Sequence, residues 1–372
     1  MPASRNLPTS RLLGFVLATA LGMALLMPVP AQSADPKTAD ALYQGGHILT
    51  LESDGEEVEA LATRDGRILA TGTRASLAPF VGPETRQIDL EGRTLMPAFV
   101  DGGEGPDALT VKVVSVFDNN PLQGLARIQA AVLVLEPQTA QPLALLEGAT
   151  LTGIRTAAVS GAATDLMSRP ESRVLGVLGA GVQARTHIEA VCCVRPIESV
   201  RVYAPSAESV ERLVSELSGR EGLPEDIQGV ASSAEAIRGA DIVCCTTTSS
   251  TPVFDDTDLA EGTHVNAVGS HQRDVAEVPA ATVVRARVVV DDYESAWEEA
   301  GDLLQPLEAG VIDRDHVVAE LAELVGGSCI GRTSDEQITL FKSVGLAVED
   351  AIAARVTLAN AAVLGVGQRV EW

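Results

Sequence analysis

A glycine-rich segment carries the most specific chemistry in the sequence. Gly179, Gly181 and Ala184 follow the apolar run of residues 173–178 with the spacing Gly-x-Gly-x-x-Ala. The first glycine permits a tight turn, the second lets the backbone approach a pyrophosphate, and the alanine permits close packing of the next helix. That helix, expected through residue 191, presents free N–H groups and its positive dipole end to phosphates. The segment therefore predicts a dinucleotide site.

The part of this site that faces the ribose leaves the choice of cofactor open. An acidic residue about 20 positions further on usually binds the ribose 2′-hydroxyl of NAD. Ala204, Pro205 and Ser206 occupy that place, so no carboxylate repels a 2′-phosphate and no arginine or lysine follows to bind one. We predict NAD or NADP as the cofactor, bound by Gly179, Ala180, Gly181, Val182, Gln183, Ser206, Thr246, Val268 and Ser343.

Three polar side chains are candidates for the reacting centre. Lys112 lies in an otherwise apolar strand, and Arg155 lies near the start of an apolar helix. A substrate carboxylate requires a cationic partner, and a hydride reaction requires a nearby acid or base. Lys112 and Arg155 could supply the cation, although each could equally be a surface residue with a packed stem. His271 could move protons near neutral pH, and a hydrogen-bonded loop histidine is an equal alternative.

The elements that must position these residues alternate along the chain. Short apolar strands are expected at residues 173–178, 199–203, 241–245, 264–268 and 287–290, separated by helices or loops. This alternation predicts a doubly wound parallel sheet, the Rossmann type of α/β fold. Nearer the N-terminus, short strands and turns are expected, with a two-residue hairpin signal at Asp65-Gly66.

Composition narrows the class of protein. The length of 372 residues suggests two or more domains, and the hydrophobic fraction of 46% excludes a disordered chain. The net charge of −24 repels phosphate backbones, so nucleic acid is not an expected partner. The adjacent pairs Cys192-Cys193 and Cys244-Cys245 are poor disulfide partners and fit no zinc ligand set. Reduced thiols favour a reducing compartment, and thus a cytoplasmic function.

The first 34 residues have the layout of a secretory signal peptide. Arg5 and Arg11 precede an apolar run at residues 12–27, and the small residues Ala31 and Ser33 mark a cleavage region. The run is too short for a permanent membrane anchor, and no other segment reaches transmembrane length. This segment predicts export, in conflict with the cofactor and the thiols.

Residues 35–94 form a β-rich segment that resembles the N-terminal β-domain of exported amidohydrolases, chiefly through residues 88–101. That family continues with a His-x-His metal pair, whereas Gly102-Gly103-Glu104-Gly105 follows here. No two of the five histidines have that spacing, so the chain lacks the clustered ligands of a zinc site. The sequence therefore predicts no metal and excludes a metal-dependent hydrolase.

From about residue 95 to residue 372 the chain resembles the ornithine cyclodeaminase/mu-crystallin family. The order and extent of the matching stretches make the resemblance specific; they are residues 95–99, 111–117, 151–158, 266–271, 299–303 and 341–347. The change from one resemblance to the other falls within residues 96–101, as either a gene fusion or an error of sequence assembly would produce.

This second resemblance implies a domain organisation and a substrate class. The dinucleotide-binding domain would be residues 157–307, and residues 95–156 with 308–372 would form a smaller domain for substrate binding and homodimerisation. Lys112 and Arg155 match the family's substrate-binding lysine and carboxylate-binding arginine. The implied reaction is NAD(P)-dependent hydride transfer at the Cα of a small amino acid or cyclic imino acid.

Two positions depart from the ornithine-cyclising members of the family. Those members resemble this chain but have an aspartate in place of His271 and a glutamate in place of Thr94. The departures favour an imine reductase or amino-acid dehydrogenase over conversion of ornithine to proline and ammonia. A non-catalytic protein that binds NADPH and a ligand, as mu-crystallin does, and an inactive fusion product remain alternatives.

Overall fold

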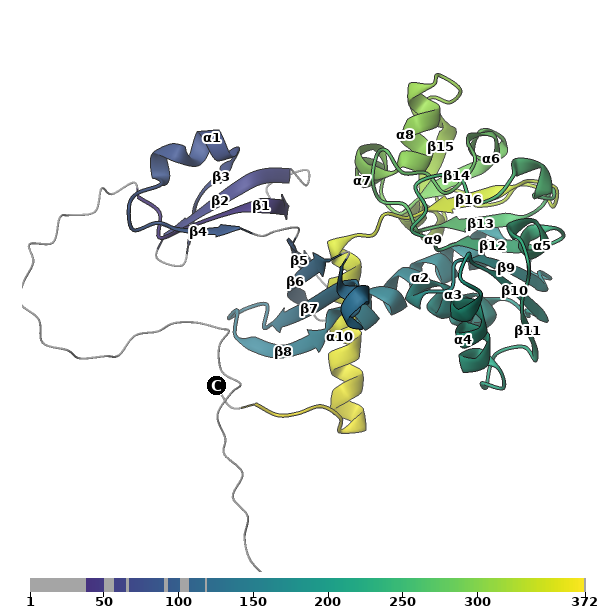
Figure 1. The fold of residues 1–372 in the computed structure, drawn as a ribbon, viewed down its shortest axis with the longest axis horizontal. Coiled ribbons are helices and arrows are strands. Elements are labelled where there is room, and N and C mark those ends of the chain that lie inside the picture. The colour runs from purple at the N-terminus through teal and green to yellow at the C-terminus, as the bar shows by residue number, and fades with distance from the viewer. Residues whose placement is uncertain are drawn as a thin grey trace, which may run out of the picture.

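The computed structural model describes residues 38–49, 57–64, 67–89, 93–100, 107–117 and 119–370. The predicted signal peptide and the turn at Asp65-Gly66 lie outside these residues. Within them, none of the helices has the length and apolar character needed to cross a membrane. The described chain forms two eight-stranded sheets, one mostly antiparallel and one entirely parallel (Figure 1).

The first sheet has the strand order β3-β2-β1-β5-β6-β7-β8, with β4 paired to β1. Its strands are β1 (Ala41–Leu49), β2 (Glu57–Arg64), β3 (Arg67–Gly72), β4 (Arg86–Asp89), β5 (Arg93–Val100), β6 (Ala108–Val116), β7 (Ile128–Leu135) and β8 (Pro142–Glu147). The helix α1 (Arg74–Leu77) packs against β2 and β3. β1 joins β5 through the pair Ile48–Leu95, so the N-terminal strands and the strand that carries Lys112 belong to one sheet.

The second sheet confirms the predicted doubly wound fold. Its order is β11-β10-β9-β12-β13-β16-β14-β15, and all of its strands run parallel. The strands are β9 (Val174–Leu178), β10 (Ser199–Tyr203), β11 (Asp226–Gly229), β12 (Ile242–Cys245), β13 (His264–Ala267), β14 (Arg287–Val290), β15 (Val317–Glu320) and β16 (Thr339–Lys342). β15 and β16 follow residue 307, where the predicted dinucleotide domain ends, so the sheet draws on more of the chain than the sequence indicated.

Helices cover both faces of the parallel sheet. Apolar side chains of α3 (Val182–Val194) and α4 (Ala207–Leu217) pack on one face, together with α2 (Gly148–Met167) and α9 (Leu321–Val325). Side chains of α5 (Ser233–Ile237), α6 (Ala280–Arg285), α7 (Tyr293–Glu299) and α8 (Gly301–Glu308) form the core on the other face. The buried strands are rich in valine, as expected of a parallel sheet covered on both faces.

Two helices connect the sheets. α2 contacts α3 and β13 of the parallel half and β7 of the antiparallel half. α10 (Ala347–Leu364) leaves the parallel sheet after β16 and packs on β5, β6 and α2, and Figure 1 shows it in yellow beside these strands. The C-terminal helix therefore returns to the sheet built from the first part of the chain.

Candidate functional site

The predicted cofactor residues gather at one edge of the parallel sheet. Because the strands are parallel, their carboxyl ends meet at the same edge, where open α/β sheets bind ligands. The residues that follow β9, β10, β12, β13 and β16 there include Gly179, Ser206, Thr246, Val268 and Ser343. From β9 the chain continues to β10 and β11 on one side, and β12 then begins the other side. Gly179 and Thr246 lie at this reversal, the usual place for a dinucleotide.

The glycine turn has the geometry that its sequence predicts. Gly179 has φ +113°, and a Cβ there would lie 2.7 Å from the carbonyl oxygen of Thr246, so only glycine fits. Gly181 caps α3, and a Cβ built on it would meet nothing within 4 Å. Open space therefore lies beside the first amides of α3, where a pyrophosphate would bind. Ala180 is half-buried and Val182 is exposed beside this turn.

Two buried polar atoms at the same edge lack a partner. The Ser343 hydroxyl and the Gln183 side-chain oxygen are both buried, and neither makes a hydrogen bond within the described residues. Buried polar groups are almost always hydrogen-bonded, so each of these atoms fits a ligand contact. Ser206 differs, because its hydroxyl caps α4 through a 3.2 Å bond from the Ser209 amide. These residues together fit a dinucleotide, which would supply or accept a hydride when bound.

The two predicted cations lie side by side in a buried ionic cluster. The Lys112 ammonium on β6 lies 2.7 Å from one carboxylate oxygen of Asp350, and the Arg155 Nε on α2 donates to the other at 3.1 Å. Arg155 also donates to Glu349 through a guanidinium nitrogen. The side chains of Lys112, Arg155 and Asp350 are 3%, 8% and 1% exposed, so neither cation is a surface residue with a packed stem.

Burial shifts the pKa values within this cluster. Loss of hydration lowers the pKa of Lys112, against the attraction of Asp350, and the Arg155 charge adds to the lowering. Loss of hydration also raises the pKa of Glu349, and the nearby charge of Asp291 adds to it despite the attraction of Arg155. An amine and a carboxyl with pKa values displaced toward neutral are typical of a binding or catalytic site.

His271 belongs to a second group of residues, at the loop after β13. Its side chain is exposed, yet partial loss of hydration lowers the pKa of His271, and the Lys342 charge lowers it further. The Lys342 ammonium is fully buried, 2.6 Å from the Ser270 carbonyl oxygen and 2.8 Å from an oxygen of Asp302. The other Asp302 oxygen accepts the amides of residues 277 and 278, and so fixes this loop.

The segment after β16 joins the two groups. Asp291, at the end of β14, accepts the amides of Val344 and Gly345 at 2.8 and 2.7 Å. Gly345 has φ +89°, and a Cβ there would overlap the Arg155 guanidinium. The backbone of residues 342–350 therefore runs from the Lys342 group past Arg155 to Glu349 and Asp350, which places the cation cluster beside the cofactor edge.

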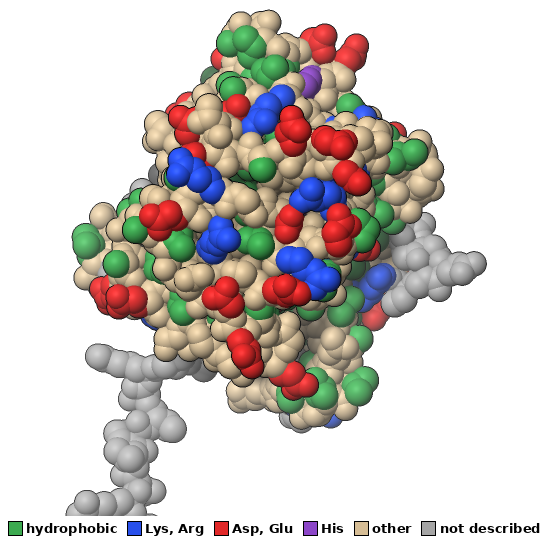
Figure 2. All heavy atoms as spheres, turned by 90° about the vertical axis from the view of Figure 1, so that its right-hand side faces the viewer, with side chains coloured by type: hydrophobic (Ala, Val, Ile, Leu, Met, Phe, Trp, Pro, Cys, Tyr) green, Lys and Arg blue, Asp and Glu red, His purple; other side chains and the backbone are tan. Residues whose placement is uncertain are grey.

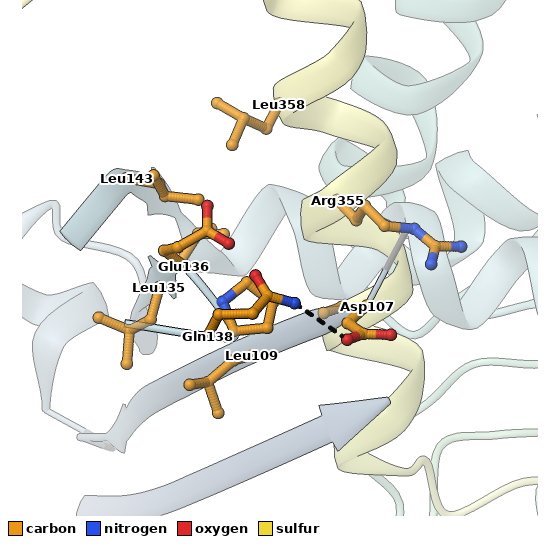
Figure 3. A pocket seen from close by; sticks show the side chains of 11 residues that line it. Asp107, Leu109, Leu135, Glu136, Gln138, Leu143, Arg355 and Leu358 are labelled. Atoms are coloured by element: carbon orange, nitrogen blue, oxygen red, sulfur yellow. Dashed lines mark hydrogen bonds between the residues drawn. The ribbon is translucent and has the colours of Figure 1, made fainter. Parts of the chain in front are cut away.

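A separate cavity of about 280 Å³ lies between α10 and strands β6 to β8 (Figure 3). Asp107, Gln138, Leu143 and Arg355 are among its lining residues, and Gln138 donates to Asp107 at 3.2 Å. None of the predicted site residues lines it. Its volume is also below the range of about 300–1,000 Å³ that small-molecule sites usually have. We therefore do not assign the cofactor or substrate to it.

The sequence did not assign roles to the carboxylates and the lysine that organise the site. Asp302 and Lys342 lie within stretches that match the family. The position of Lys342 in an apolar strand was a signal that could have identified it. Asp291, Glu349 and Asp350 gave no comparable signal, because carboxylates are common on the surface of so acidic a chain. Their importance depends on burial and on partners far away in sequence.

The sequence matches a model of the ornithine cyclodeaminase/mu-crystallin family over residues 72–363. Alanine dehydrogenase of Archaeoglobus fulgidus is 33% identical over 332 residues, or 87% of this chain and 98% of the relative. That alignment is longer than the stretch from residue 95 to residue 372. The similarity therefore extends into the N-terminal β-rich segment. The resemblance of that segment to amidohydrolases is not supported, in agreement with the single sheet that contains β1, β5 and β6.

Relatives of high identity share one activity. Delta(1)-pyrroline-2-carboxylate reductase of Bacillus cereus is 42% identical over 270 residues, which cover 72% of this chain and 82% of the relative. The solved structure of the Thermococcus litoralis Delta(1)-pyrroline-2-carboxylate reductase, in complex with NADH and L-proline, is 40% identical with a TM-score of 0.68. The match covers 75% of this chain and 90% of the solved structure. This chain is therefore an NAD(P)-dependent oxidoreductase that belongs to the ornithine cyclodeaminase/mu-crystallin family.

Proposed function

We propose that this protein reduces a cyclic imino acid, with Δ1-pyrroline-2-carboxylate as the first candidate, to the corresponding amino acid. The observation that carries the proposal is the buried pair Lys112 and Arg155, held together by Asp350 beside the dinucleotide edge. Two buried cations beside a hydride donor suit a small substrate whose carboxylate is next to the reacting carbon. The identity to pyrroline-2-carboxylate reductases supports the same substrate.

Each residue has a distinct role in this reaction. Arg155 and Lys112 bind the substrate carboxylate and so orient the imine carbon toward the nicotinamide, which supplies the hydride when bound. The imine nitrogen gains a proton, and His271 in the loop after β13 is our candidate donor. Gly179, Gly181 and the amides at the start of α3 bind the pyrophosphate, and Ser343 and Gln183 supply polar contacts.

Ornithine cyclisation has less support than imine reduction. The cyclising members of the family use an aspartate where this chain has His271, and a neutral imidazole cannot replace its charge. The lowered pKa of His271 makes the neutral form the main one near pH 7. We therefore expect little or no release of ammonia and proline from ornithine.

The test is a steady-state assay of the purified protein with NADH and with NADPH. Δ1-pyrroline-2-carboxylate, Δ1-piperideine-2-carboxylate and pyruvate with ammonia are the substrates, and ornithine is the comparison. Arg155→Ala should lower kcat/KM about 10- to 100-fold, chiefly through KM, because a charge-assisted hydrogen bond is lost. Binding of NAD(P)H and an imino acid without turnover would instead indicate a binding protein. Release of proline and ammonia from ornithine without net cofactor consumption would make it a cyclodeaminase.

A further inference from the structure

The positive charges around Arg155 are already compensated before any substrate enters. Lys112 and Arg155 contribute two positive charges, Asp350 and Glu349 contribute two negative charges, and Asp291 adds a further negative charge near Glu349. A substrate carboxylate would bring one more negative charge into a group of mostly buried side chains. An uncompensated charge in such a place is costly. Binding therefore requires that one of the two carboxylates bound to Arg155 moves away or takes up a proton.

The two carboxylates are not equally free to do so. Asp350 is 1% exposed and uses one oxygen for Lys112 and the other for Arg155, so its removal would separate the two cations. Glu349 is 12% exposed and contacts only the Arg155 guanidinium in this cluster. Loss of hydration and the nearby charge of Asp291 also raise the pKa of Glu349. Glu349 is thus the carboxylate that can move away from Arg155.

We propose that Glu349 occupies, in the ligand-free protein, the position on Arg155 that the substrate carboxylate takes, so that binding exchanges one carboxylate for another. Asp350 stays as the fixed bridge between Lys112 and Arg155. Glu349 is then a determinant of substrate affinity that opposes binding and acts through Arg155. The inference rests on the proposed function only in that the ligand is a carboxylate.

The first test compares Glu349→Gln with the wild type in calorimetric titrations of L-proline into the NADH-loaded protein. We expect about fivefold tighter binding in the variant, the upper range of a partly exposed ion pair, and a matching decrease in KM for the imine. Glu308→Gln, which removes an exposed glutamate bound to Arg273, controls for the change in net charge and should bind like the wild type. Asp350→Asn should weaken binding.

The second test is the pH dependence of L-proline affinity. Within the described residues, the charged groups around Glu349 are Lys112 on β6, Arg155 on α2, Asp291 after β14 and Asp350 on α10. As pH falls toward the raised pKa of Glu349, protonation should release Arg155 and tighten binding in the wild type but not in Glu349→Gln. Deprotonation of Lys112 at high pH affects both proteins alike.

These outcomes separate the two proposals. Equal or weaker L-proline binding by Glu349→Gln, or no L-proline binding by either protein, would overturn the carboxylate exchange. A wild type that binds L-proline but reduces no imine with either cofactor would instead contradict the proposed function, and the exchange would still be judged by the binding data.

Discussion

Buried charges in this protein occur in groups that compensate one another. Lys112 and Arg155 share Asp350, and the fully buried Lys342 is bound by Asp302 and Ser270. Removing one partner of such a group leaves an unpaired buried charge, whose cost is about 3–5 kcal/mol. These pairs therefore hold their members in place. Glu349 is the most exposed member, which agrees with our proposal that it exchanges with a ligand.

His271 is the residue whose role is best judged from a pH profile. If its protonated form delivers a proton to the imine nitrogen, kcat/KM should fall as pH rises through the pKa of His271, which lies below its ordinary value of 6.5. His271→Asn should lower kcat by about 100-fold or more and abolish that decline, because asparagine does not titrate in this range.

A matched control is His316→Asn, which changes a histidine that bonds to the Val283 carbonyl oxygen away from the cofactor edge. Its pH profile should match that of the wild type. An unchanged profile in His271→Asn would show that another group or water supplies the proton.

At the scale of elements, the site depends on where strands end and helices begin. The carboxyl ends of β9, β12, β13 and β16 supply the cofactor edge, and α2 and α10 supply Arg155, Glu349 and Asp350. α10 contacts both β6 and α2, so its first turn can bridge the lysine of one element and the arginine of the other. Neither element alone would form the proposed substrate site.

The turn between β9 and α3 offers a direct test of cofactor binding. Gly181→Trp should fill the space beside the α3 amides and abolish NAD(P)H binding in calorimetry, while the melting temperature stays within a few degrees of the wild type. The fold should be retained, because a Cβ at Gly181 meets nothing within 4 Å and the glycine has φ −97°, which other residues adopt.

Gly181→Ala is the matched control, since its small side chain occupies less of that space and should weaken binding less. Equal cofactor affinity in the tryptophan variant and the wild type would mean that the pyrophosphate binds elsewhere.

At the scale of the whole molecule, exposed apolar side chains occur on both halves. Figure 2 views the molecule from the side of the parallel sheet, where acidic and basic side chains are interspersed with apolar ones. The antiparallel half exposes apolar side chains that include Leu143 and Leu145 on the edge strand β8 and Val356 and Val363 on α10. Exposed apolar surface of this kind is typical of a protein–protein interface.

We predict that the exposed apolar side chains of the antiparallel half form a homodimer interface, in line with the assembly that the family resemblance implies. Leu145, 71% exposed on β8, should be buried in it, so Leu145→Glu should convert the dimer to a monomer in size-exclusion chromatography with light scattering. Val325→Glu changes a residue of similar exposure, 68%, on α9 of the parallel half and should leave the dimer intact. A monomeric wild type would contradict the prediction.

The sequence by itself determined the features that depend on neighbouring residues. The glycine spacing after β9 and the apolar runs of β10, β12, β13 and β14 identified a dinucleotide fold, because turn geometry and strand burial are encoded locally. It also singled out Lys112 and Arg155, since cations in apolar segments are unusual. The sequence left open whether Lys112 and Arg155 were surface residues, because a residue type at one position does not show which distant residues contact it.

Only the tertiary structure decided how the site is organised. Lys112, Arg155 and Asp350 lie far apart along the chain and meet because α10 folds back across β6 and α2. The N-terminal strands looked like a different protein when read alone, yet β1 pairs with β5 in the sheet that carries Lys112. Charge pairing and strand pairing act through space between distant segments. For that reason the folded chain, and not its local patterns, revealed the carboxylates that control the two cations.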